Sequence, residues 1–208
     1  MGPQVMAGLT LMAGAIAIGM LGGAARGGPV INQRPVGRAM AIILMAFCAG
    51  VSVMTVVVAL IAMTDGPRTP STDAAWVPGL LAGAGAVLGL VIARRAGEAA
   101  EPGVASIALS FELGLAMLGI VLTVVRLTMA GRGHAAPPDV PYVGIGLLTA
   151  AMVLAMGVTG ASALGRLADA ADATAAMAVY RGQIIRAAML EGVAVMGVVA
   201  AILILFLA

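Results

Sequence analysis

The sequence predicts an all-α membrane protein with six transmembrane helices, arranged as three tandem helical hairpins. Hydrophobic residues make up 62% of the 208 residues and charged residues only 10%. Several apolar runs reach the roughly 20 residues needed to cross a bilayer. The expected spans are Val5–Ala25, Ala39–Met63, Trp76–Ala93, Val104–Val125, Val140–Leu164 and Ala187–Ala208. The connections between them are too short to hold a soluble catalytic domain.

The distribution of arginines predicts the orientation. The odd-numbered connections hold Arg26, Arg34, Arg38, Arg94, Arg95, Arg166, Arg181 and Arg186, and the even-numbered ones hold Arg68, Arg126 and Arg132. Because positive charge favours the cytoplasmic side, we expect the odd-numbered loops in the cytoplasm and both termini on the opposite side. The first run has no preceding Arg or Lys and is interpreted as a retained helix rather than a signal peptide. A net charge of +2 gives no indication of a nucleic-acid partner.

Internal similarity divides the chain into three units. The expected hairpins are residues 1–64, 74–131 and 140–208, separated by stretches rich in Pro and Gly. The second helices align as GVSVMTVVVAL at 50–60, LGLAMLGIVLT at 113–123 and GVAVMGVVAAI at 192–202. This similarity indicates tandem duplication of one hairpin. The first helices are rich in Gly and Ala, which predicts a tightly packed inner row and an outer row of bulkier helices.

Two acidic residues recur at the same position of this repeat. Glu112 and Glu191 each precede the aligned segment, and Ala49 occupies the position in the first hairpin. A charged side chain inside a membrane span costs about 3 kcal/mol on insertion scales, so such residues are candidates for a function. A single isolated acid could equally well hold a neighbouring helix without transporting anything. The repeat favours the functional interpretation, with Glu112 and Glu191 as ion-carrying residues.

The segment that carries Glu191 resembles a known family. Residues 190–199, LEGVAVMGVV, are similar to the Glu-Ala-Leu-Ala-Ile-Tyr-Gly-Leu-Val-Val pattern of the proteolipid, or subunit c, of rotary ATPases. Gln33-Arg34-Pro35 is close to the Arg-Gln-Pro of the polar loop in that family. The resemblance implies a triplicated hairpin that assembles with copies of itself into a rotor ring. It also implies a stator subunit supplying an arginine, central-stalk subunits at the cytoplasmic loops, and nucleotide chemistry in other subunits.

The resemblance further implies transport by reversible protonation. Loss of water favours the neutral form of a carboxyl group, whereas a stator arginine would favour its ionised form. Sodium would need several oxygen ligands around each acid, and only Thr149, Thr159, Ser110 and backbone carbonyls could add them. We therefore expect protons to be carried. Because Ala49 leaves two carriers for three hairpins, the arrangement suggests ATP-driven pumping.

Two other classes of function stay open from sequence. One is a standalone six-helix secondary transporter that uses Glu112 and Glu191 as proton relays, and the other is a membrane scaffold or assembly protein. No Cys/His cluster or phosphate-binding loop is visible, so we expect no catalytic residue, cofactor or metal. Trp76 and Tyr142 each begin an expected span, which is typical of interfacial anchors.

Overall fold

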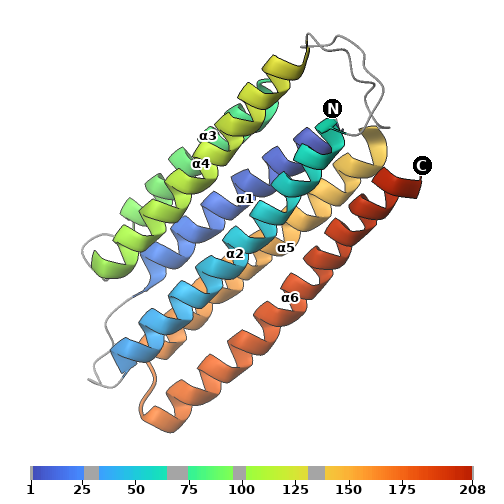
Figure 1. Cartoon of the computed structure of the whole chain (residues 1–208). Helices are drawn as coiled ribbons and strands as arrows, with labels where there is room; N and C mark the ends of the chain where they lie inside the picture. Colours follow the sequence, from blue (N-terminus) through green and yellow to red (C-terminus); the bar gives the residue numbers. More distant parts are fainter. Residues whose placement is uncertain (1, 26–32, 65–74, 96–101, 131–138, 208) are drawn as a thin grey trace.

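The computed structural model describes residues 2–25, 33–64, 75–95, 102–130 and 139–207, and every regular element in these ranges is an α-helix (Figure 1). The helices are α1 (Gly2–Ala24), α2 (Gln33–Thr64), α3 (Val77–Arg95), α4 (Pro102–Ala130), α5 (Asp139–Ala168) and α6 (Ala173–Leu207). All six are long and apolar enough to cross a membrane. The prediction of an all-helical fold is confirmed for the described residues, and the six apolar helices are consistent with a multi-pass membrane protein. The stretches expected to separate the hairpins lie mainly at residues 65–74 and 131–138, outside the described ranges.

Helix α1 lies at the centre of the bundle. Its most extensive contacts are with α5 and α3, and it also packs against α2 and α4. Helix α2 in turn contacts α4 and α6. The helices therefore form two layers, with α3, α1 and α5 in one and α4, α2 and α6 in the other (Figure 1). The start of α1 and the end of α6 lie at the same end of the bundle.

Glycines allow close backbone contact within the layer that contains α1. A methyl group added to Gly85 of α3 would lie 2.6 Å from the α-carbon of Met12. On the other side of α1, a methyl group on Gly157 of α5 would lie 2.7 Å from the α-carbon of Ala17. Small residues stabilise helix pairs in lipid because they let the backbones approach and increase van der Waals contact. The Gly- and Ala-rich faces therefore hold α3 and α5 against α1.

Helix α6 begins earlier than the expected span. It starts at Ala173, whereas the sequence predicted a span from Ala187 and a long polar connection that included Arg181 and Arg186. The backbone N–H of Ala175 donates to Oδ1 of Asp172 at 2.7 Å, which is a helix N-cap. Arg181 and Arg186 therefore lie on a helical extension that precedes the apolar span expected from Ala187. Charged residues interrupt an apolar run without interrupting helical structure.

The two expected interfacial aromatic residues differ in their surroundings. Trp76, just before α3, is exposed, as expected for an anchor. Tyr142 of α5 is fully buried in a cluster with Met6, Val58 and Val198. Its assignment as an interfacial anchor was wrong, because its side chain packs against residues of α1, α2 and α6 inside the bundle.

Candidate functional site: two carboxyl groups within the helices

Glu112 lies on the buried face of α4. Ala108 and Leu115, about one turn before and after it, are buried and point at Gly22 and Gly14 of α1. Only 2% of Glu112 is exposed. The i, i+3 and i+4 spacing of small and apolar residues thus turns this face of α4 toward α1, and the same packing encloses the acid.

A glycine of α3 provides the space for this carboxyl group. A methyl group on Gly89 would lie 3.0 Å from Oε1 of Glu112 and 2.5 Å from the carbonyl oxygen of Ala15. The acid therefore reaches the line of contact between α1 and α3. Within the described residues, Oε1 is buried and has no hydrogen-bond partner. An ionised carboxylate without donors is costly in such surroundings, so burial of Oε1 without a partner favours the protonated form of Glu112.

Glu191 has a more open position. It shares a face of α6 with Gln183, Ala187 and Ala194, which are buried, while Glu191 itself is half-buried. It lies close enough to Cys48 of α2 to interact with it electrostatically. The adjacent Gly192 has open space beside its α-carbon. Glu191 is therefore partly accessible from outside the bundle, whereas Glu112 is enclosed.

Ala49 is buried on α2 and contributes no titratable group. Ser52, about one turn further along the helix, is also buried and donates a hydrogen bond of 3.1 Å to the carbonyl oxygen of Thr10 in α1. Next to the repeat position of the first hairpin, the link to α1 is therefore made by the neutral hydroxyl group of Ser52.

Two threonines connect α1 with α5 near this point. The hydroxyl oxygens of Thr10 and Thr149 lie 2.8 Å apart, and both residues are fully buried. The Thr149 hydroxyl group also lies 3.0 Å from the carbonyl oxygen of Ile145 in its own helix. With the bond from Ser52, these hydroxyls link α1, α2 and α5.

Replacing Thr149 with valine is expected to lower the free energy of unfolding by about 0.6 kcal/mol, the average for hydrogen bonds between transmembrane helices. Valine has the same shape but cannot bond to Thr10. Thr128→Val is the control, because among the described residues that exposed hydroxyl bonds only to the carbonyl oxygen of Val125 in its own helix. Reversible unfolding in mixed micelles measures both variants. Equal losses in the two would show that the contact between α1 and α5 has no specific effect.

The three expected oxygen donors do not surround the acids. Thr149 bonds to Thr10, and Thr159 accepts a hydrogen bond of 3.1 Å from Gln183. Ser110 is exposed and donates to the carbonyl oxygen of Ser106. In the described part of the chain, none of the three bonds to Glu112 or Glu191. These three hydroxyl groups are therefore engaged elsewhere, and a hard cation at either acid would depend on other oxygen atoms, such as backbone carbonyls.

Gln183 is a buried polar residue that the sequence reasoning missed. Only 1% of it is exposed, its Nε2 donates to Thr159, and its Oε1 has no partner among the described residues. The residue was placed in a polar connection before α6. The i, i+4, i+8 spacing of Gln183, Ala187 and Glu191 could have shown that one helical face continues through all three.

The two acids do not form one site. They lie on α4 and α6, and α2 contacts both of these helices. Among the described residues, no group of three or more His, Cys, Asp or Glu side chains could hold a metal ion. Comparison with protein families, with curated proteins and with solved structures gives no match for this chain.

Proposed function

We propose that the chain is an ion-carrying rotor-ring subunit of a membrane rotary ATPase, which translocates protons by reversible protonation of Glu112 and Glu191. The subunit itself would be non-catalytic, because the proposal assigns ATP chemistry to other subunits. Its proposed partners are copies of itself, a stator subunit that supplies an arginine, and central-stalk subunits at the odd-numbered loops.

The observation that carries the proposal is the common level of the three repeat positions along the bundle. Gly14 of α1 lies against Ser52 of α2 and Leu115 of α4, each three residues after its repeat position, Ala49 or Glu112. Gly22 of α1 lies against Met45 and Ala108, each four residues before its own repeat position. Ala49 and Glu112 are therefore level on two sides of α1.

The third position lies at the same level. An apolar groove of ≈ 240 Å³ between α2 and α6 has among its lining residues Val53 and Val57 of α2 and Val195 and Val199 of α6. Val53 and Val57 follow Ala49 by four and eight positions, and Val195 and Val199 follow Glu191 by the same two intervals. Three equivalent positions at one level are what a ring needs if successive hairpins pass the same stator group. A standalone transporter has no such requirement.

The layers support the same proposal. Each odd-numbered helix contacts the even-numbered helix that follows it, as expected for three hairpins. The close packing around α1 would place the odd-numbered helices in the inner row of a ring and the even-numbered ones in the outer row. In the described part of the chain, none of the three expected hydroxyl donors bonds to either acid, which favours protons over sodium. Two carriers for three hairpins would favour pumping against a steep gradient.

A standalone proton-coupled transporter is the second candidate. The observation that favours it is the enclosure of Glu112 between α1, α3 and α4 of a single chain, which requires no second copy. The two candidates predict different assemblies, since a rotor forms a large ring and a transporter a monomer or small oligomer.

Modification by a hydrophobic carbodiimide tests the proton-carrying role, because the reagent enters the bilayer and reacts with protonated carboxyl groups. We expect Glu112 and Glu191 to be modified near neutral pH, less so as the pH rises, and without protection by Na⁺. Asp169 and Asp172 are exposed and serve as internal controls that should react little. Peptide mass spectrometry of treated native membranes measures all four. Unmodified Glu112 and Glu191 would contradict the role, and protection by Na⁺ would identify sodium as the ion.

A further inference from the structure

A small pocket lies between the last turn of α5 and the first half of α6. Its volume is ≈ 230 Å³, and it is lined by Arg166, Ala178, Val179, Gly182, Gln183 and Arg186. We refer to it as the α5–α6 pocket. It is distinct from the groove beside Val53 and Val195, which is wholly apolar.

The charge of this pocket is positive and uncompensated. Arg166 and Arg186 are both exposed, and no carboxylate lines the pocket. Neither arginine forms an ion pair within the described part of the chain. Two guanidinium groups that line one pocket repel each other unless an anion lies between them. Planar guanidinium groups with several N–H donors are well suited to bind phosphate oxygens.

Gln183 adds a second, independent feature. It is 1% exposed, lines the same pocket, and is held by its bond from Nε2 to Thr159. Its Oε1 atom is buried and has no partner among the described residues. Buried amide oxygens nearly always accept a hydrogen bond, so this unpartnered oxygen of a pocket-lining residue is a candidate acceptor for an anion that also carries a donor, such as a hydroxyl group.

The location in the membrane indicates the source of that anion. Arg166 lies near the end of the candidate span Tyr142–Ala168, and Arg186, which lines the same pocket, directly precedes the apolar run that begins at Ala187. Arginines at such positions reach the headgroup region, where phosphates of anionic lipids are concentrated. We propose that the α5–α6 pocket binds the headgroup of an anionic phospholipid. Arg166 and Arg186 contact the phosphate, and Oε1 of Gln183 accepts a hydrogen bond from a headgroup hydroxyl group.

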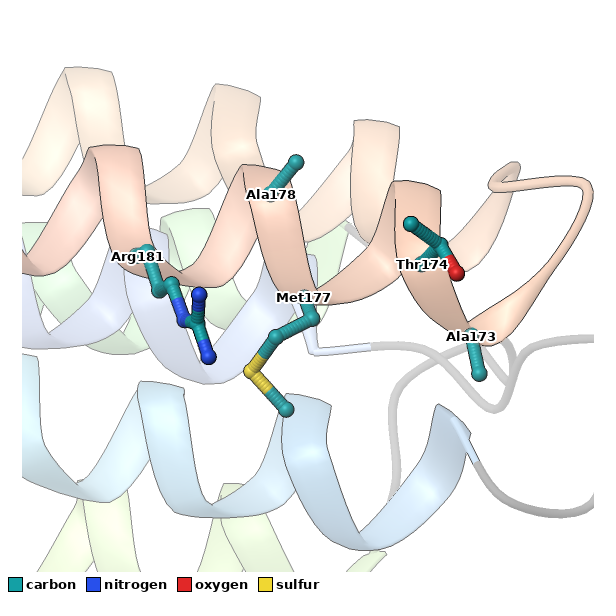
Figure 2. A pocket seen from close by; sticks show the side chains of 5 residues that line it. All are labelled: Ala173, Thr174, Met177, Ala178 and Arg181. Atoms are coloured by element: carbon teal, nitrogen blue, oxygen red, sulfur yellow. The ribbon is translucent and has the colours of Figure 1, made fainter.

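A neighbouring arginine offers a matched control. Arg181 lines a separate pocket of ≈ 390 Å³ with Ala173, Thr174, Met177 and Ala178. In Figure 2 the side chains of Met177 and Arg181 extend from α6 toward α2, on the side opposite Ala178. Arg94, in the last turn of α3, is also exposed. The double variant Arg94→Gln with Arg181→Gln therefore removes as much charge as Arg166→Gln with Arg186→Gln but leaves the α5–α6 pocket intact.

The test uses the purified full-length chain in micelles with added phosphatidylglycerol, and native mass spectrometry measures the lipid retained. We expect the Arg166/Arg186 variant to retain about tenfold less phosphatidylglycerol, and the Arg94/Arg181 variant to match the unchanged chain. Equal losses in both variants would overturn the proposal, since they would show attraction to charge alone. No loss in either would also overturn it.

Two further measurements examine the chemistry of the headgroup. Gln183→Leu should lower retention of phosphatidylglycerol, which has headgroup hydroxyl groups, toward that of phosphatidic acid, which lacks a headgroup alcohol. If the Gln183→Leu variant retained phosphatidylglycerol over phosphatidic acid as strongly as the unchanged chain does, the role of Gln183 would be contradicted. Displacement of the lipid by millimolar inorganic phosphate would mean that the pocket binds free phosphate, and would overturn the lipid assignment. The arginine variants change exposed residues, so folding does not limit this test.

Discussion

Replacing either Glu112 or Glu191 with glutamine is expected to reduce ATP-driven proton uptake by native membrane vesicles to the level of vesicles without the complex. Glutamine preserves the shape of the side chain but cannot release a proton. In the layer of even-numbered helices, α2 lies between α4 and α6, so the repeat positions follow one another as Glu112, Ala49 and Glu191. Either substitution leaves two successive positions without a carrier. We therefore expect both variants to lose transport to the same extent.

Equal amounts of each variant chain in the membrane would show that folding and insertion are intact. Quenching of a pH-sensitive dye during ATP hydrolysis measures the uptake. A variant at one position that transports normally would contradict the shared role of the two acids. Loss at one position alone would favour the standalone transporter, in which the enclosed Glu112 and the accessible Glu191 would have different tasks.

Replacing Gly89 with alanine is expected to move the Glu112 carboxyl group and destabilise the bundle. The added methyl group would lie 2.5 Å from the carbonyl oxygen of Ala15 and 3.0 Å from Oε1 of Glu112. Inserting a methyl group into such close packing costs about 1–3 kcal/mol. Since the acid loses its space beside α1, we expect the rate of carbodiimide modification of Glu112 to change while that of Glu191 stays the same.

Two other glycines of α3 separate this effect from general loss of packing. A methyl group on Gly85 would lie 2.6 Å from the α-carbon of Met12 but reaches no carboxyl group, so Gly85→Ala should destabilise the bundle without altering Glu112. Gly83 has nothing within 4 Å, so Gly83→Ala should be close to neutral. If Gly85→Ala and Gly89→Ala changed the modification of Glu112 equally, the specific role of Gly89 in positioning the acid would be wrong.

The sequence was sufficient to predict the helices and their class, because long apolar runs strongly constrain a chain in a membrane. Trp76 is exposed and α3 begins at the next residue, Val77, as the sequence predicted. The burial of Tyr142 was missed, because an aromatic residue at the end of a span is ambiguous until the neighbouring helices are known. Helix α6 begins before the apolar span expected from Ala187, since Arg181 and Arg186 interrupt the hydropathy but not the helix.

The candidate acids could be identified from the sequence, but their unequal surroundings could not. Glu112 and Glu191 occupy the same position in the repeat, yet one is enclosed and the other is half-exposed. The difference arises from the order of helices around α1, and in particular from Gly89 of α3 next to Glu112. Contacts between helices far apart in the sequence decide that order. Periodicity within one helix carries no information about them.

The mass of the assembly in native membranes tests the proposed rotor most directly. The complex would be extracted under mild conditions, isolated through a tag on this chain, and analysed by native mass spectrometry. We expect many copies of the chain in a closed ring, together with nucleotide-hydrolysing subunits and a stator subunit. A monomer or dimer without such partners would contradict the rotor and leave Glu112 and Glu191 as residues of a standalone membrane protein.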